Sequence, residues 1–131
     1  MKFEVKTGKD FELIDITAQV KSMVKESNVK NGLALIFTKH TTTGVLLNEN
    51  EPGLIHDFME MFLKLVPKGA GYRHDIIDRN AHSHLLASLI GQSQVIPVEN
   101  GELLLGTWQK IFLVELDGPR ARKVVVKVIG D

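Results

Sequence analysis

Near the start of the chain, two short stretches alternate between hydrophobic and polar residues, the pattern of a half-buried β-strand. The first is KFEVKT at 2–7 and the second is FELIDIT at 11–17, with GKD at 8–10 between them. A short connection that contains glycine is typical of a tight turn between antiparallel strands. We therefore expect a β-hairpin over residues 2–17.

Helical spacing of apolar residues and typical capping residues predict three helices. The first covers about 17–28, with Thr17 as its N-cap. The second covers 52–66, because a Pro-Gly pair opens it and a proline follows it. The third is shorter and covers about 80–91, with Asn80 as its N-cap.

The helix predicted at 52–66 is unusually apolar. On a helical wheel, the polar side chains of His56, Asp57, Glu60 and Lys64 share one arc of about 100°. The rest of the circumference carries Leu, Ile, Phe, Met and Val. We therefore expect this helix to be covered on two sides, and another subunit is a candidate for one of the covers.

The remaining hydrophobic runs predict β-strands. LALIF at 33–37 is continuously apolar, which is typical of a strand buried on both faces. The other expected strands cover 43–50, 93–98, 101–106, 108–116 and 123–129. Because strands outnumber helices and come mainly as meanders, we expect an α+β fold rather than a doubly wound parallel sheet. The chain has no low-complexity linker, which favours one domain over 1–131.

Charge and cysteine content narrow the classes of function. Sixteen Lys and Arg residues balance sixteen Asp and Glu residues, so no overall field favours nucleic acid or an anionic membrane. The one basic cluster, RARK at 120–123, is short. Cysteine is absent, which excludes disulfides, thiolate metal sites and cysteine nucleophiles. Since the sequence shows no signal peptide and no apolar run near the roughly 20 residues of a membrane span, we expect a cytoplasmic protein.

Five histidines are the main candidates for chemistry. A single histidine is more often a satisfied polar group than a ligand, but four of these five fall in loops or at element ends, where sites are usually assembled. They are His40, His74, His82 and His84, whereas His56 lies on the polar arc of its helix. Three histidines and a water are a common open zinc site. No fixed spacing such as HExxH supports that interpretation.

The histidines in NAHSHL at 80–85 cannot both bind one ion on a helix. Residues two apart point about 200° from one another. If Asn80 is the cap, either His82 or His84 is outside the site. Carboxylates near the histidines in sequence could be ligands or could orient them. These carboxylates belong to Glu49, Asp57, Asp75 and Asp78.

Three further features have two interpretations each. HTTTG at 40–44 could donate hydrogen bonds to a phosphate, although threonine is also common in strands. Thr107 and Trp108 follow a glycine, and either a bulge with a core tryptophan or a ligand wall would explain them. Glu115 interrupts an apolar strand, so we expect its side chain to face outward, with a buried catalytic carboxylate as the alternative.

Taken together, these stretches resemble the YjbQ-like family, which is named for a secondary thiamine-phosphate synthase activity. HTTTGVLLNEN at 40–50, HDF at 56–58 and GYRHD at 71–75 are similar to its His-Thr and Asn-Glu-Asn segment, its His-Asp helix and its Tyr-x-His-Asp loop. The stretch NAHSHLLASLIGQSQVIPVENGELLLGTWQKIF at 80–112 is similar to its signature, and DGPRARKV at 117–124 follows as expected.

The resemblance implies an α+β fold with a β-sandwich of antiparallel or mixed sheets and about three helices, assembled as a homotrimer. Of the two neighbouring histidines, His84 matches the family and the position of His82 is commonly another residue. The implied polar cluster comprises His40, Asn48, Glu49, His56, Asp57, His74, Asp75 and His84, with Thr107 and Trp108 nearby.

The first functional hypothesis is an enzyme for phosphorylated small molecules, with thiamine-phosphate synthesis as at least a side activity. That reaction joins a pyrimidine diphosphate to a thiazole phosphate and releases pyrophosphate, which a divalent ion, zinc or magnesium, would stabilise. We assign the ion to His40, His74 and His84. The other expected roles are catalysis by Glu49, His56 and Asp57, and substrate binding by Thr41, Thr42, Asn48, Thr107, Trp108 and Arg120.

Two alternatives remain open at this point. A metal-dependent hydrolase would use the same three histidines and an open water position. A non-catalytic trimeric protein that carries a metabolite or an ion would use the same polar cluster without turnover. Few Lys and Arg residues lie near the candidate segments, although two phosphorylated substrates would call for several.

Overall fold

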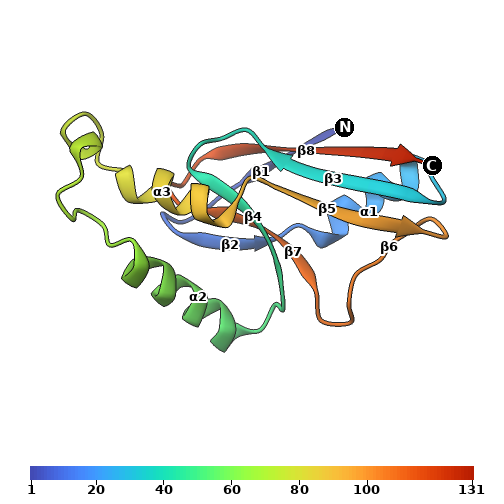
Figure 1. The fold of residues 1–131 in the computed structure, drawn as a ribbon, viewed down its shortest axis with the longest axis horizontal. Coiled ribbons are helices and arrows are strands. Elements are labelled where there is room, and N and C mark those ends of the chain that lie inside the picture. The colour runs from blue at the N-terminus through green and yellow to red at the C-terminus, as the bar shows by residue number, and fades with distance from the viewer.

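The computed structural model describes residues 1–131 as an α+β fold with three α-helices, which confirms the predicted class (Figure 1). In chain order the elements are β1 (Lys2–Lys6), β2 (Glu12–Asp15), α1 (Thr17–Glu26), β3 (Gly32–Thr38), β4 (Thr43–Asn48), α2 (Pro52–Leu65), the 3-10 helix η1 (Arg73–Ile76), α3 (Ala81–Ile90), β5 (Ser93–Glu99), β6 (Glu102–Leu103), β7 (Lys110–Glu115) and β8 (Ala121–Gly130). The predicted helices and strands are all present, with ends that differ by a few residues.

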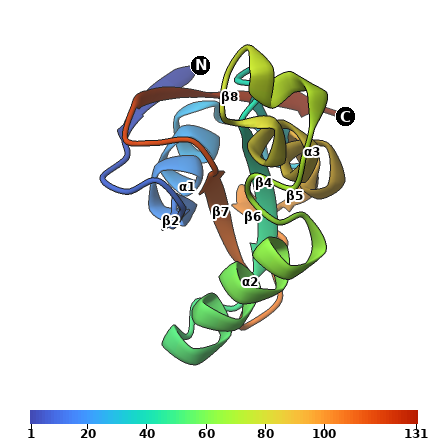
Figure 2. The ribbon, with the colours of Figure 1, turned by 90° about the vertical axis from the view of Figure 1, so that its left-hand side faces the viewer.

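The strands form two antiparallel sheets. One has five strands in the order β1-β8-β3-β5-β6, and the other has three in the order β2-β7-β4. Helices α2 and α3 lie on the side of the three-stranded sheet that faces away from the larger sheet (Figures 1 and 2). The resulting sandwich is the arrangement that the family resemblance implies.

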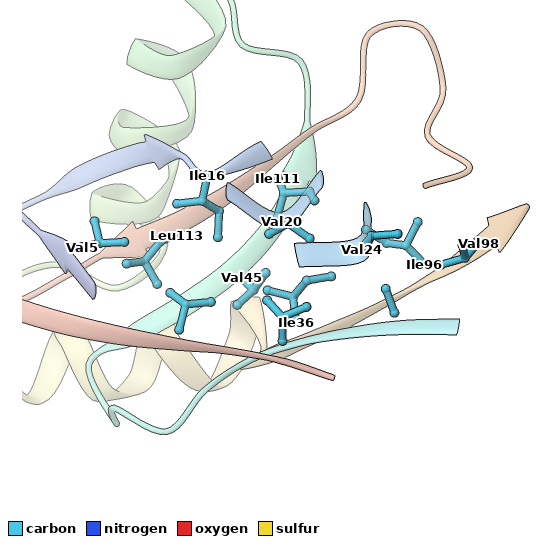
Figure 3. Close-up of a cluster of buried hydrophobic side chains, with 13 residues drawn as sticks. Val5, Ile16, Val20, Val24, Ile36, Val45, Ile96, Val98, Ile111 and Leu113 are labelled. Atoms are coloured by element: carbon cyan, nitrogen blue, oxygen red, sulfur yellow. The ribbon is translucent and has the colours of Figure 1, made fainter. Parts of the chain in front are cut away.

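The main core fills the space between the two sheets and is closed by α1 (Figure 3). Val20 and Val24 of α1 pack with Ile36 from the larger sheet and with Val45 and Leu113 from the smaller one. All five side chains are at most 1% exposed. Fully burying a side chain of this kind stabilises a fold by about 1.5–3 kcal/mol relative to leaving it in water.

Strand β7 lies in the middle of the smaller sheet and has both faces buried. Ile111 and Leu113 belong to the core between the sheets, whereas Val114 packs in a second cluster with Phe62 of α2 and Leu86 of α3. From Ile111 to Glu115 no position of this strand faces solvent, so every side chain in that stretch has to be accommodated inside the protein.

The predicted hairpin at the start of the chain is wrong. β1 pairs with β8, where Phe3 lies opposite Val124, and β2 pairs with β7, where Leu13 lies opposite Val114. The two strands therefore belong to different sheets. Alternation shows that one face of a strand is buried, but it does not specify the partner strand.

Thr17 is the first residue of α1 rather than its cap, so that part of the prediction is also wrong. The Oδ1 atom of Asp15 accepts hydrogen bonds from the backbone N–H and the hydroxyl of Thr17, at 3.0 and 2.6 Å. The Thr17 hydroxyl oxygen in turn accepts a hydrogen bond from the Ile111 N–H at 2.8 Å. The side chain therefore ties the helix to β7, which leaves it unavailable for capping.

Helix α2 is covered on only one side within the chain. Phe62 is its one buried residue, and Leu65 is 64% exposed, with Met61 and Leu63 also exposed. The second cover expected from the sequence does not come from the same chain.

No helix of the protein combines the length and the hydrophobicity that a membrane span requires.

Candidate functional site

A polar cleft opens at the end of the molecule that faces the viewer in Figure 2, where the β3–β4 connection, η1, the start of α3 and the β7–β8 turn meet. We call it the histidine cleft, and its volume is about 540 Å³. It is lined by Lys39, His40, Thr41, Thr42, His74, Ile77, Asp78, Asn80, His84, Asp117, Arg120 and Arg122. Three histidines from three separate segments therefore meet in one place.

His74 and His84 lie against each other in the cleft. Their ring centroids are 4.9 Å apart, and the rings are nearly perpendicular at 81°. The Nε2 atom of His74 is 3.0 Å from the Oδ1 atom of Asn80, and the Nδ2 group of Asn80 donates to Asp117 at 2.9 Å. Because Asn80 Oδ1 is an acceptor, this contact places a hydrogen on Nε2, and in the neutral ring the lone pair is then on Nδ1.

Asn80 occupies the predicted N-cap position of α3, but its side chain makes no capping hydrogen bond. The Oδ1 atom of Asp75 accepts from the Ala81 N–H at 3.0 Å instead. The expected capping bond is therefore wrong. The side chain of Asn80 is free to orient His74 because Asp75 satisfies the helix end.

His40 is held in a different way. Its Nε2 atom accepts a hydrogen bond from the Lys123 backbone N–H at 3.1 Å, so the neutral ring carries its hydrogen on Nδ1. Partial burial, followed by the positive charge of Arg122, lowers the pKa of His40 below its usual value. At neutral pH this histidine is therefore an uncharged hydrogen-bond donor.

Glu115 and Arg122 form an ion pair at the base of the cleft. Glu115 is 0% exposed, so the expectation that it faces outward is wrong. The Nε and NH2 groups of Arg122 donate to its two carboxylate oxygens at 2.8 and 2.5 Å, and the Thr7 hydroxyl donates at 2.7 Å. Burial alone would raise the pKa of Glu115, but hydrogen bonds from Arg122, Thr7 and the Asp117 backbone hold this pKa below its usual value.

The ion pair positions the walls of the cleft. Arg122 donates a further hydrogen bond to the Thr42 hydroxyl oxygen at 2.9 Å, and the Asp117 backbone N–H donates to Glu115 at 3.1 Å. Asp117 then holds the Arg120 guanidinium through its backbone oxygen at 2.7 Å and its carboxylate at 3.1 Å. The β3–β4 connection and the β7–β8 turn are thus linked through one buried pair.

Gly118 is required by the closeness of this packing. A Cβ atom at this position would clash with the backbone oxygen of Lys9, and it would lie 2.8 Å from Glu115 Cγ and 2.9 Å from Thr7 Oγ1. Any side chain here would push the β7–β8 turn away from the ion pair, so glycine at this position preserves the shape of the cleft.

Comparison with known proteins agrees with this architecture. The whole chain, residues 1–131, matches the family described as UPF0047 protein YjbQ-like. A UPF0047 protein of Archaeoglobus fulgidus is 51% identical over 98% of this chain and 100% of its own length, and YugU of Bacillus subtilis is 39% identical over 97% and 96%. This chain belongs to the YjbQ-like UPF0047 family.

Solved structures of the family have the same fold. A YbjQ-like protein of unknown function from Sulfolobus solfataricus P2 superposes with a TM-score of 0.98 at 44% identity, covering 100% of this chain and 96% of its own. A YjbQ/UPF0047 family protein of Clostridium acetobutylicum gives 0.95 at 47% identity, covering 98% and 99%. The fold that the family resemblance implies is therefore confirmed.

The structure brings together half of the residues proposed from the sequence. The histidine cleft contains His40, Thr41, Thr42, His74, His84 and Arg120. The other candidates, Asn48, Glu49, His56, Asp57, Thr107 and Trp108, do not line it. Trp108 is 70% exposed between β6 and β7, so the interpretation as a core tryptophan is wrong.

His56 and Asp57 lie on the exposed polar arc of α2 together with Glu60. Ligand atoms of these three residues lie within 4.8 Å of one another, and this is the one group of three potential metal ligands in the chain that is so compact. The side chains of His56 and Asp57 are 70% and 74% exposed. His40, His74 and His84 share the cleft but do not form such a group.

Several residues that line the cleft are not among the site candidates from the sequence. They are Lys39, Asn80, Asp117 and Arg122. Arg122 could have been recognised, because the alternation along β8 places it on the same buried face as Val124. A buried arginine requires a buried partner, and that requirement would have pointed to Glu115.

His82 lies outside the cleft, in agreement with the argument that His82 and His84 cannot share one site. It is 3% exposed, and its ring stacks on Phe11 with centroids 5.7 Å apart. Its Nδ1 atom has no hydrogen-bond partner. Burial, and then the charge of Lys68, lowers the pKa of His82 below its usual value.

Removing Glu115 alone should strongly destabilise the protein. Glu115→Ala leaves Arg122 buried without a counter-charge, so we expect a loss of about 3–5 kcal/mol in the free energy of unfolding, measured by urea titration. The exposed Glu4→Ala is the control and should change stability by no more than about 0.5 kcal/mol. The double variant Glu115→Leu/Arg122→Met should recover most of the loss. A loss below about 1 kcal/mol in Glu115→Ala would contradict the role of the pair.

His82 should make the protein less stable in acid. Its pKa in the folded state lies below the unfolded value of about 6.5, so the unfolded state binds more protons at low pH. The contribution of His82 to the free energy of unfolding is complete above about pH 6.5. As the pH falls from there towards the folded pKa, this contribution decreases by up to about 1.4 kcal/mol for each pH unit. Urea titrations of wild type and His82→Leu between pH 7.5 and 5 measure this effect.

The slope of stability against pH should be smaller in His82→Leu than in the wild type. It should not vanish, because the pKa of His40 is lowered as well and contributes in the same direction. Gln19→Leu, an exposed change that removes no titratable group, should leave the slope unchanged. An equal slope in wild type and His82→Leu would show that His82 is not buried in its neutral form.

Proposed function

We propose that this protein is an enzyme that binds a phosphorylated small molecule in the histidine cleft, with thiamine-phosphate synthesis as at least a side activity. The observation that supports this most strongly is the meeting of His40, His74 and His84 with two threonine hydroxyls and Arg120 in one cleft. Imidazole, hydroxyl and guanidinium groups together can bind a phosphate and move a proton beside it.

The phosphate would be bound by donors that the fold already orients. The Thr42 hydroxyl oxygen accepts from Arg122, so its own hydrogen is free to be donated to a ligand. Because His40 Nε2 accepts the hydrogen bond from the Lys123 N–H, the neutral ring carries its hydrogen on Nδ1. This Nδ1–H group can therefore donate to a ligand as well. Arg120 and Lys39 add positive charge at the rim, although Asp117 partly neutralises Arg120. A leaving diphosphate would be stabilised by the same groups.

A divalent ion fits part of the residue set predicted from the sequence. The Nε2 group of His74 is hydrogen-bonded to Asn80, and its Nδ1 lone pair is free in the neutral ring. Metal-binding histidines are commonly oriented by such a hydrogen bond from the second ring nitrogen. The ring of His84 is adjacent. His40 fits less well, because its Nε2 atom is already bonded to Lys123. When bound, such an ion would supply positive charge beside the phosphate.

We propose that the site is completed by a second copy of the chain within a homotrimer. The resemblance places Glu49, His56 and Asp57 in one polar cluster with the three histidines, but none of them reaches the cleft in its own chain. Ile77 lines the cleft and is 86% exposed, and the adjacent Ile76 of η1 is 88% exposed. Apolar side chains of this size, exposed beside a cleft, are typical of surfaces that another protein covers.

The same groups would also serve a metal-dependent hydrolase of phosphate esters. The pairing of His74 with His84 is the observation that favours it, because an ion held there leaves positions for water. Turnover of phosphate esters that requires added zinc or magnesium, without thiamine-phosphate formation, would select this alternative. Tight ligand binding without any turnover would instead indicate a binding protein.

His84→Ala should abolish the synthase activity. Purified wild type is expected to form thiamine phosphate slowly from the pyrimidine diphosphate and the thiazole phosphate. The rate is measured by chromatography of the product. Loss of an imidazole that moves a proton costs about 100-fold or more in rate. Gln19→Ala, an exposed change on α1, is the control and should leave the rate unchanged. Equal rates in His84→Ala and wild type would contradict the assignment.

Mixing two inactive variants should restore activity if the site lies between copies. His84→Ala lacks a group of the cleft, and Asp57→Ala lacks a group supplied by the neighbouring copy. After joint unfolding and refolding at equal amounts, about a quarter of the sites should combine two intact halves in a cyclic trimer. No recovery in mixed trimers, or a protein that sediments as a monomer, would contradict the shared site.

A further inference from the structure

A second pocket lies at the opposite end of the molecule from the histidine cleft, between α1 and the β5–β6 turn (Figure 1). We call it the lysine pocket, and its volume is about 430 Å³. It is lined by Lys21, Val24, Lys25, Lys30, Asn100, Gly101, Glu102 and Leu103. We propose that this pocket binds a small organic phosphate that carries at least two negative charges, independently of the histidine cleft.

The charge of the pocket is unbalanced although the chain as a whole is neutral. Lys21, Lys25 and Lys30 contribute three ammonium groups, and Glu102 is the one acidic residue in the lining. None of the three lysines takes part in an ion pair. Lys21 and Lys25 are four residues apart on α1, where like charges repel one another. A bound anion would remove this repulsion and satisfy all three ammonium groups.

The frame of the pocket is fixed before any ligand binds. Asn100 and Gly101 form the two-residue turn between β5 and β6, with φ angles of 53° and 80°. Both values are those of the tight hairpin turn that Asn-Gly favours. The Gly101 N–H donates to the Lys30 backbone oxygen at 2.9 Å, which joins this turn to the segment after α1. A fixed frame lowers the entropy lost on binding.

The floor of the pocket is apolar. Val24 belongs to the main core and is 1% exposed, and Leu103 is half-buried beside it. The volume lies within the range of about 300–1,000 Å³ that is usual for small-molecule sites. Lysines at the rim and an apolar floor suit a ligand whose phosphate is attached to an apolar or aromatic body, such as a mononucleotide, better than inorganic phosphate alone.

The proposal can be tested by titrating the full-length protein with adenosine 5′-monophosphate and recording amide ¹H–¹⁵N spectra. We expect saturable shifts of the Lys21, Lys25, Lys30 and 100–103 amides. Adenosine, which has no phosphate, should leave them unchanged, and pyrophosphate, which has no apolar body, should bind more weakly. The amide signals of His74 and His84 report binding in the histidine cleft separately. The experiment therefore shows independently whether a ligand binds in the lysine pocket and whether it binds in the histidine cleft.

Lys25→Gln/Lys30→Gln should weaken binding at least tenfold, because each charge-assisted contact to a phosphate contributes on that scale. Lys2→Gln, on the exposed face of β1, is the matched control and should bind as the wild type does. The proposal is overturned if the double variant binds as tightly as the wild type. It is also overturned if the shifts do not saturate, are spread over all exposed lysines, or occur only in the histidine cleft.

Discussion

The ion pair between Glu115 and Arg122 is the interaction on which the histidine cleft depends. Both side chains are almost completely removed from water, so neither charge is tolerable without the other. The remaining hydrogen bonds of the pair reach Thr7, Thr42 and the backbone of Asp117, which places three loops around one carboxylate and one guanidinium. Hydrophobic packing holds the two sheets together, but it does not determine how these loops face one another. The shape of the cleft therefore depends on the buried ion pair rather than on the hydrophobic packing between the sheets.

Much of the fold could be predicted from the sequence, because hydrophobic periodicity reports burial directly. It located the three helices and the strands. The continuous apolar run in β3 indicated burial on both faces, and that part of the prediction is wrong, because Leu33 and Phe37 are 48% and 38% exposed. The pairing of β1 with β8 could not be predicted from local patterns, since partners more than a hundred residues apart leave no signal in either strand. The predicted capping residues are wrong for a related reason. The side chains of Thr17 and Asn80 make tertiary hydrogen bonds, and neighbouring aspartates accept from the N–H groups at the helix ends instead.

Residues of the candidate site could be predicted from the sequence where helix geometry limits which side chains can meet. They could not be predicted where contacts between distant segments determine the arrangement. Residues two apart on a helix face different ways, which separated His84 in the cleft from His82 in the interior. The sequence predicts an exposed Glu115, because a lone carboxylate in an apolar strand normally faces water. Its partner Arg122 is seven residues away across a turn, and only the fold shows that the two meet. Local sequence therefore indicates which groups are available, and the tertiary structure decides which of them act together.

If the histidine cleft binds a phosphate as proposed, its three histidines must respond to that phosphate together. The most direct measurement is a titration of the wild-type protein with inorganic pyrophosphate, followed through the imidazole ¹H–¹⁵N signals. The signals of His40, His74 and His84 should shift together and saturate at one ligand concentration, while buried His82 stays unchanged. If the cleft histidines do not respond, or respond at different concentrations, the cleft is not a phosphate site and the proposed function is contradicted.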